Sequence, residues 1–232
     1  MPLDRWLIAD VPLFQGLDDA ALDDILGSAR SARYSKDDAI FEEEGEAHSF
    51  FLLLHGHVRV VKTTPDGSQI IVRYINEGEL MGIAAAIGRT TYPATAVAAV
   101  DSVAISWPTS AWSGLASRYP SFAGNAYANI GARLQETQQR VVEMSTEQVE
   151  QRVAHALLRL VQQAGRKTDE GIEIDFPITR QDIAEMTGTT LHTVSRILSG
   201  WEGEGVVASG RQKVTVTDPH ALMLIAEQRR SK

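Results

Sequence analysis

The side chains best suited to chemistry lie in one short segment, residues 179–198, which reads TRQDIAEMTGTTLHTVSRIL. Thr179 is followed three residues later by Asp182, and this spacing forms a capping box that begins a helix. Gly188 supplies the positive φ that a sharp turn requires, and one of the two threonines after it caps a second helix. Two helices joined by such a turn form a helix-turn-helix, which places its second helix in the major groove of DNA.

The second helix of this segment has two chemically different faces. Its inner face is apolar and carries Val194, Ile197, Leu198 and Trp201. Its outer face lies near the helix N-terminus, where a recognition helix contacts base edges. The side chains expected to contact bases are therefore those on that outer face: Leu191, His192, Ser195 and Arg196.

A hairpin is expected directly after the two helices. Residues 206–208 and 213–217 read as strands, and Ser209-Gly210 reads as the turn between them. Such a hairpin is a wing, and it places Arg211 and Lys213 near DNA phosphates. Two short helices with this spacing also occur without DNA, and some winged helices only bind proteins. The combination of cap, glycine, apolar face and wing favours DNA binding.

A long amphipathic helix over residues 122–144 is predicted to precede this motif. A helix of about 23 residues is about 35 Å long, more than one small domain needs. Its free part is expected to pack against a second copy in a two-fold dimer, a reading that we favour over packing within one chain. A polar hinge at residues 145–150 and another helix at 147–164 follow.

The N-terminal half shows the pattern of a closed β-structure after a short helix at residues 18–26. Strands are predicted at residues 49–54, 58–62, 69–75 and 94–106, and turn glycines recur at 45, 56, 67 and 78. The predicted fold is α+β, with a β-roll, a long helix and a winged helix-turn-helix. The predicted domains are residues 1–120, the sensor, residues 121–145, the dimerisation helix, and residues 146–232, the DNA-binding domain.

Composition restricts the chemistry and the compartment. The 232 residues include no cysteine, which excludes disulfides, iron–sulfur clusters and cysteine nucleophiles. No apolar run approaches the ~20 residues of a membrane span and no secretory signal is visible, so the cytoplasm is expected and a membrane partner is not. The net charge is −8, but residues 146–232 hold 11 basic and 12 acidic side chains. A basic surface for DNA is therefore compatible with that segment.

Two other classes of protein compete with a DNA-binding regulator. An enzyme would need catalytic motifs, but the acidic run at residues 42–44 stands alone. The glycines at 200, 203 and 205 follow a helix, where a dinucleotide loop follows a strand. We expect no catalytic residues, no metal site and no enzymatic activity. The other alternative is a cyclic-nucleotide-type signalling module without a DNA-binding role, and the recognition helix and wing argue against it.

With these features, the chain resembles the cyclic AMP receptor/fumarate-nitrate regulator (CRP/FNR) family over nearly its whole length. Residues 178–207 resemble the family's helix-turn-helix, and PLFQGL, EGE, HG and EGEL at residues 12–17, 44–46, 55–56 and 77–80 resemble its β-roll landmarks. The resemblance implies that the β-roll is a jelly roll of the cyclic-nucleotide-binding type. It also implies a transcription regulator that binds palindromic double-stranded DNA as a homodimer and contacts RNA polymerase.

The resemblance also implies roles for single residues. Arg196 falls where the family places an arginine that pairs with guanine O6 and N7, and Ser195 matches a serine that contacts bases. His192 stands where relatives commonly carry glutamate, and Leu191 replaces a polar residue, so the half-site read here differs. The positions that match phosphate contacts are Thr179, Arg180, Gln181, Thr190 and Thr193.

The expected effector pocket departs from that of the cyclic AMP-binding members, which hold the nucleotide with a glutamate and an Arg-Ser pair. Glu79 matches the glutamate, but Ala94 and Thr95 stand where the pair is expected. A buried phosphate without a guanidinium loses its main charge-assisted partner, so cyclic AMP is disfavoured. Arg89 would replace the missing arginine only if the loop between residues 89 and 94 had a different conformation from that of the cyclic AMP-binding members. Thr137 is also expected in this pocket.

Haem is the second candidate effector that the resemblance suggests. Residues 92–96, YPATA, resemble the nitric-oxide and anaerobic regulators, some of which use haem. His55 and His57 are expected to alternate on one strand and share a face, although most such histidines are surface or packing residues. Haem therefore stays a possible cofactor, and the effector is left open.

Overall fold

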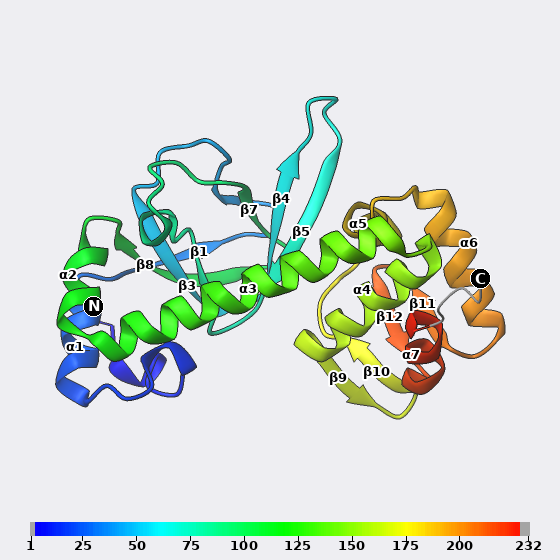
Figure 1. The fold of residues 1–232 in the computed structure, drawn as a ribbon. Coiled ribbons are helices and arrows are strands. Elements are labelled where there is room, and N and C mark those ends of the chain that lie inside the picture. Colours follow the sequence, from blue (N-terminus) through cyan, green and yellow to red (C-terminus); the bar gives the residue numbers. More distant parts are fainter. Residues whose placement is uncertain (1–2, 228–232) are drawn as a thin grey trace. The chain divides into compact units, whose positions relative to one another are not determined.

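The computed structural model describes residues 3–227, and Figure 1 shows the order of its helices and strands. The chain divides into two compact units, Met1–Lys62 with Val72–Glu136 and Thr63–Ile71 with Thr137–Lys232. We call them the N-terminal unit and the C-terminal unit. Helix α3 (Pro120–Thr146) contributes residues to both. The boundaries predicted at residues 120 and 145 stay a prediction.

Two four-stranded sheets form the β-roll, as the sequence predicts. In one sheet β8 pairs antiparallel with β1 and β3, and in the other β7 pairs antiparallel with β2 and β4. In spatial order the first sheet contains β1 (Arg30–Tyr34), β8 (Ser102–Pro108), β3 (Ser49–His55) and β6 (Leu80–Met81). The second contains β2 (Ala39–Phe41), β7 (Thr95–Ala98), β4 (Val58–Thr63) and β5 (Gln69–Ile75).

The single strand predicted over residues 94–106 is wrong, because that segment forms two strands in different sheets. β7 ends at Ala98 and β8 begins at Ser102, whose hydroxyl donates to the main-chain oxygen of Val100 at 2.8 Å. The turn glycines are also only partly as expected. Gly56, Gly67 and Gly78 have positive φ, but near residue 45 the left-handed position is taken by Glu44, with φ 61°.

Short helices and an aromatic core close the N-terminal unit. The Asp18 carboxylate accepts a hydrogen bond from the Ala21 amide and so caps α1 (Asp19–Gly27), which confirms the short helix predicted there. The aromatic side chains of the core include Phe14, Phe50, Trp107, Trp112 and Phe122. The remaining helical elements are η1 (Arg5–Leu7), η2 (Pro12–Phe14), η3 (Ala84–Ile87) and α2 (Ala111–Arg118).

Helix α3 confirms the predicted long helix and extends it at both ends. It leaves three large apolar side chains exposed at seven-residue intervals, Tyr127, Leu134 and Val141. Gln148 caps the next helix, α4 (Val149–Ala164), in a capping box with Gln151. None of the helices in residues 3–227 is long and apolar enough to cross a membrane.

The C-terminal unit contains the predicted helix pair and wing, together with one hairpin that the sequence did not indicate. Its sheet has the order β11-β12-β10-β9. The hairpin of β9 (Gly165–Thr168) and β10 (Gly171–Ile174) joins the wing strands β11 (Val207–Gly210) and β12 (Lys213–Val216). The helices are α5 (Arg180–Thr187), α6 (Leu191–Gly203) and α7 (Pro219–Glu227).

The turn of the wing lies two residues later than predicted. Ser209 and Gly210 belong to β11, and Gly210 pairs with Lys213. The loop therefore consists of Arg211 and Gln212, and Gln212 takes the left-handed conformation with φ 60°. Arg211 is thus placed at the tip of the wing.

Candidate functional site

The helix-turn-helix is built by the local signals that the sequence contains. The Thr179 hydroxyl accepts from the Asp182 amide at 3.0 Å, and the Asp182 carboxylate accepts from the Thr179 amide at 2.7 Å. Gly188 ends α5 with φ 61°, and the Thr190 hydroxyl caps α6 by accepting from the Thr193 amide. The capping box, the turn glycine and the second cap are therefore confirmed.

Packing fixes the inner face of α6 against the rest of the C-terminal unit. Val194 and Leu198 are fully buried, and Trp201 is nearly so. The indole N–H of Trp201 donates to the Glu150 carboxylate at 3.1 Å, which ties the end of α6 to the start of α4. Because its inner face is held in this way, α6 presents its opposite face in a defined orientation.

The four side chains predicted to contact bases lie together on that opposite face. Leu191 is 47% exposed, His192 and Arg196 are exposed, and Ser195 is partly exposed. Their spacing of one, four and five residues places them on one side of a helix. Within the part of the chain that the structure describes, Arg196 forms no ion pair, so its guanidinium is available for a ligand.

Most of the residues predicted to contact phosphates are already bonded within the motif. Arg180 donates from Nη2 to the Ser209 hydroxyl at 2.9 Å and to the Glu202 carboxylate at 3.3 Å, which joins α5, α6 and β11. Gln181 donates to the Glu185 carboxylate. The hydroxyls of Thr190 and Thr193 are hydrogen-bonded to each other. These side chains surround the recognition helix, and Thr179 lies among them as the cap of α5.

The two basic side chains of the wing are in different states. Lys213 Nζ lies 2.6 Å from the carboxylate of Glu173, a residue of the unexpected hairpin. This bond, with help from Arg166, holds the pKa of Glu173 below its usual value. Lys213 is therefore partly neutralised by its neighbour. Arg211 at the wing tip is exposed.

Two arginines hold the helix-turn-helix from outside, and the sequence analysis missed both. Arg140 of α3 donates from Nη2 to the main-chain oxygen of Met186 at 2.8 Å. Arg152 of α4 donates from Nε to the main-chain oxygen of Thr187 at 3.1 Å. Both oxygens belong to the last turn of α5, where main-chain acceptors lack helix partners. The sequence does not show which arginines donate to the carbonyl groups at a helix end, so these two contacts could not be predicted.

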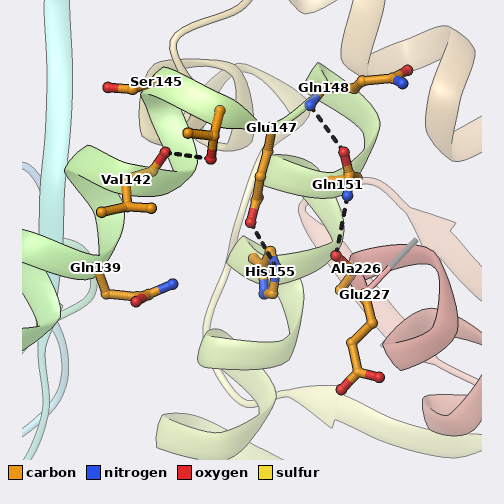
Figure 2. A pocket seen from close by; sticks show the side chains of 10 residues that line it. Gln139, Val142, Ser145, Glu147, Gln148, Gln151, His155, Ala226 and Glu227 are labelled. Atoms are coloured by element: carbon orange, nitrogen blue, oxygen red, sulfur yellow. Dashed lines mark hydrogen bonds and ion pairs between the residues drawn. The ribbon is translucent and has the colours of Figure 1, made fainter. Parts of the chain in front are cut away.

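A polar hollow of about 930 Å³ lies where α3 meets α4 and α7 in the C-terminal unit (Figure 2). His155 and Glu147 point toward each other across it, 3.3 Å apart, and Gln151 donates to the main-chain oxygen of Ala226. Its lining is mostly amide, hydroxyl and carboxylate groups. Across residues 3–227 no cluster of three or more histidine, aspartate or glutamate side chains has metal-binding geometry. The hollow therefore offers hydrogen-bonding groups.

A second cavity, of about 220 Å³, lies within the N-terminal unit. We call it the sensor cavity. Its lining comes from both sheets, from η3 and from α3. The lining residues are Phe41, Val60, Arg73, Ile75, Met81, Gly82, Ile83, Ala84, Ile87, Pro93, Ala94, Ile130 and Arg133.

The structure gathers only one of the five predicted effector residues at this cavity. Ala94 lines it, but Glu79 lines a different cavity and accepts hydrogen bonds from Arg73 and from the Asn76 amide. Arg89 pairs with a surface glutamate, and the Thr95 hydroxyl is bound by the Glu43 amide. Thr137 belongs to the C-terminal unit. The structure therefore does not gather the predicted set, because Glu79, Arg89 and Thr95 are bonded to other residues of the N-terminal unit.

The polar groups that do line the sensor cavity are two arginines. Arg73 donates to Glu79 at 2.6 Å, and Arg133 donates to the main-chain oxygen of Leu80 at 2.5 Å. Arg133 also lies 3.9 Å from Glu79. Burial, reinforced by the like charge of Arg73, lowers the pKa of Arg133 to about 10. Arg133 is therefore still a cation at neutral pH.

The two histidines expected to share a face of one strand do not do so. β3 ends at His55, Gly56 turns the chain with φ 94°, and His57 precedes β4, so the two do not alternate along one strand. His55 pairs with Glu77 at 2.7 Å and His57 bonds Asn76 at 3.0 Å. No histidine is among the residues that line the sensor cavity. The residues present do not fit a haem.

A β-roll sensor and a winged helix-turn-helix that share one long helix define an effector-controlled transcription regulator. Residues 31–119 match the model of the cyclic nucleotide-binding domain, and residues 151–225 match that of the Crp-like helix-turn-helix domain. The cyclic AMP receptor protein of Thermus thermophilus is 30% identical over 93% of this chain and 96% of its own. This chain belongs to the CRP/FNR family of DNA-binding transcription regulators.

Two further comparisons agree with that assignment. The nitrogen fixation regulation protein FixK of Bradyrhizobium diazoefficiens is 25% identical over 90% of this chain and 87% of its own. The structure of FixK2 from Bradyrhizobium japonicum matches with a TM-score of 0.77 at 23% identity, covering 87% of this chain and 98% of that one. The structural match supports the fold.

Proposed function

We propose that this regulator acts in the cytoplasm as a homodimer that binds a palindromic site in double-stranded DNA, without catalysing a reaction. A signal received in the β-roll sets its affinity for DNA, and the bound dimer contacts RNA polymerase. The observation that carries the DNA-binding proposal is the exposed face of α6. This face presents Arg196, His192, Ser195 and Leu191 together. Among residues 3–227, no carboxylate forms an ion pair with Arg196.

On the DNA, we assign the base contacts to α6 and the phosphate contacts to its surroundings. Arg196 donates two hydrogen bonds to guanine in each half-site. Arg211 at the wing tip and Arg180, braced by Glu202 and Ser209, contact phosphates, which position the protein but carry no sequence information. The two half-sites lie about one DNA turn, ~34 Å, apart.

The exposed stripe on α3 supports the homodimer. Tyr127, Leu134 and Val141 are 51%, 58% and 61% exposed, and they recur every seven residues. A seven-residue apolar repeat is the pattern with which two helices pack side by side. A second copy of α3 brings the same stripe, so a two-fold contact covers both.

The DNA contacts are tested by fluorescence anisotropy on a palindrome selected from random DNA and on an unrelated duplex. Arg196→Ala is expected to weaken binding to the palindrome by about 1–3 kcal/mol and to affect the unrelated duplex less. Arg211→Ala is the matched control, with equal losses on both duplexes and a smaller salt dependence. Equal losses for Arg196→Ala would remove its base-reading role.

The dimer is tested by sedimentation at micromolar concentration. Leu134→Lys and Val141→Lys are expected to give monomers, because a charge replaces an apolar contact within the stripe. Leu224→Lys, which alters an equally exposed leucine on α7, is expected to leave the dimer intact. A wild-type monomer under these conditions would contradict the proposal.

The nature of the signal is also part of the proposal. The Thermus relative is named a cyclic AMP receptor protein, but here Ala94 lines the sensor cavity where an arginine was expected. A cyclic phosphate at that position has no guanidinium partner from residue 94, so we propose that cyclic AMP is not the signal. Calorimetric titration with cyclic AMP tests this, and micromolar binding would overturn it.

A further inference from the structure

The lining of the sensor cavity divides into an apolar part and a cationic part. Eleven of the thirteen lining residues are apolar or glycine, and the other two are Arg73 and Arg133. Ile83 and Ile87 come from the segment around η3, and Ile130 comes from α3. A ligand that fills the cavity therefore meets hydrocarbon over most of its surface.

The cationic part consists of two arginines whose nearest carboxylates come from residues outside the lining. No aspartate or glutamate is among the lining residues. Glu79 lies beside the arginines, 2.6 Å from Arg73 and 3.9 Å from Arg133, and Glu136 also acts on Arg133 through its charge. Arg73 holds Glu79 closely, and Arg133 keeps the longer of the two contacts. The arrangement favours an anion near Arg133, because guanidinium and carboxylate form strong charge-assisted hydrogen bonds.

The same lining is poorly suited to a sugar or a nucleotide. No serine, threonine, tyrosine, asparagine or glutamine is among its residues, so ribose hydroxyls would lose water and find no side-chain partners besides the two arginines. Pockets for drug-sized ligands measure about 300–1,000 Å³. The sensor cavity, at about 220 Å³, fits a smaller molecule.

We propose that the sensor cavity binds a small organic monocarboxylate, with the carboxylate paired to Arg133 and the apolar body among Ile83, Ile87 and Ile130. The ligand class rests on the cavity alone. The further step, in which this ligand changes the affinity for DNA, rests on the function proposed above. The two steps are tested separately.

Binding is measured on the full chain by isothermal titration, with octanoate, 4-phenylbutanoate and octanamide as probes. Octanamide has the same chain as octanoate without the charge. At least one carboxylate is expected to bind below about 1 mM, and octanoate is expected to bind about tenfold more tightly than octanamide. Arg133→Met is expected to abolish that preference. Arg89→Met, a surface arginine outside the cavity, is expected to retain it.

Ala94→Leu provides a second variant that leaves both arginines in place. Residue 94 lines the cavity, so the larger side chain is expected to occupy it and to remove binding of octanoate and octanamide alike. Circular dichroism and the unfolding midpoint establish that each variant is folded. If Arg133→Met fails to fold, the preference of the wild type for octanoate together with Ala94→Leu decides the question.

The proposal would be overturned if no carboxylate bound, or if octanoate and octanamide bound equally well. It would also be overturned if Arg133→Met kept the preference for octanoate. Micromolar binding of haemin or cyclic AMP that is lost in Ala94→Leu would overturn it as well. Anisotropy with the selected palindrome then tests regulation. Carboxylate binding that leaves the affinity for DNA unchanged would support the cavity assignment and contradict the regulatory step. Failure to bind any selected DNA, with and without the ligand, would instead contradict the proposed function.

Discussion

Arg159 of α4 donates from Nη1 to both carboxylate oxygens of Glu143 of α3, at 2.9 and 2.8 Å. The Glu143 side chain is only 5% exposed and that of Arg159 is 21% exposed. The two helices meet at the polar link around Gln148, so this pair fixes the angle at which α4 leaves α3. A nearly buried carboxylate depends on such a partner.

Removal of one member of this pair should destabilise the C-terminal unit. Arg159→Met leaves Glu143 buried without its cation, and we expect a loss of about 3 kcal/mol in the free energy of unfolding. The double variant Glu143→Met/Arg159→Met should recover most of that loss, because no charge is then left buried. Urea unfolding followed by Trp201 fluorescence measures both, with the other three tryptophans replaced by phenylalanine. A single variant as stable as its parent would show that the pair contributes nothing.

The turn of the helix-turn-helix should be destabilised by a side chain at Gly188. Its φ of 61° costs an L-residue about 1–2 kcal/mol, and the end of the Met144 side chain would have to move away from a Cβ that lies 2.5 Å from its Cε. Gly188→Ala is therefore expected to destabilise the unit by about 1–2 kcal/mol. Gly200→Ala is the control, since that helical position has open space and alanine should stabilise it by up to about 1 kcal/mol. The same sign for both variants would contradict this account.

Glu173 should restrain the contribution of Lys213 to DNA binding. Glu173→Gln removes the carboxylate 2.6 Å from the Lys213 ammonium and leaves the cation free for a phosphate. We expect tighter binding to unrelated DNA, and a slope of log affinity against log salt that is steeper by about one. Asp175→Asn is the control, because Asp175 pairs with Arg166 and not with Lys213. Identical salt slopes for Glu173→Gln and wild type would show that Lys213 does not reach DNA.

Asp24 should make the N-terminal unit sensitive to acid. The Tyr119 hydroxyl at 2.7 Å and the Arg118 guanidinium at 2.6 Å hold the pKa of Asp24 below its ordinary value of 3.8. Its stabilisation is therefore present above pH 3.8 and is lost as the pH falls through the lowered folded value. Asp24→Asn should lower the unfolding midpoint at neutral pH, by an amount that shrinks toward pH 3.

The control for this pH dependence is Asp10→Asn, a change at another exposed aspartate of the same unit. It should shift the midpoint little at any pH. If the gap between wild type and Asp24→Asn stays constant from pH 7 to pH 3, the stabilisation does not come from the ionised Asp24.

The helix-turn-helix could be predicted from the sequence because its signals act over a few residues. Thr179 bonds Asp182 three positions away, and Gly188 turns the chain between the two helices. The β-roll was predictable for the same reason, since glycines such as Gly56 turn neighbouring strands. Local rules therefore supplied both domains and the exposed face of α6.

The sensor cavity could not be predicted, because its wall forms from segments that meet only after folding. Arg73, Ile83, Ala94 and Arg133 lie on separate elements, and no periodicity reports which of them face one another. The hairpin of β9 and β10 was missed for a related reason. Residues 165–168 are GRKT, without an apolar alternation, and they are ordered as a strand by pairing with β10, which pairs in turn with β12.

That added hairpin changes what the wing brings to an encounter with DNA. Strand β12 lies between β11 and β10, so hydrogen bonds to neighbouring strands restrain it from both sides. Its main-chain amides should exchange slowly with deuterated water even when no DNA is present. A wing ordered in advance loses little conformational entropy on association. The favourable energy of the phosphate contacts that we propose for it is then available to lengthen the lifetime of the complex.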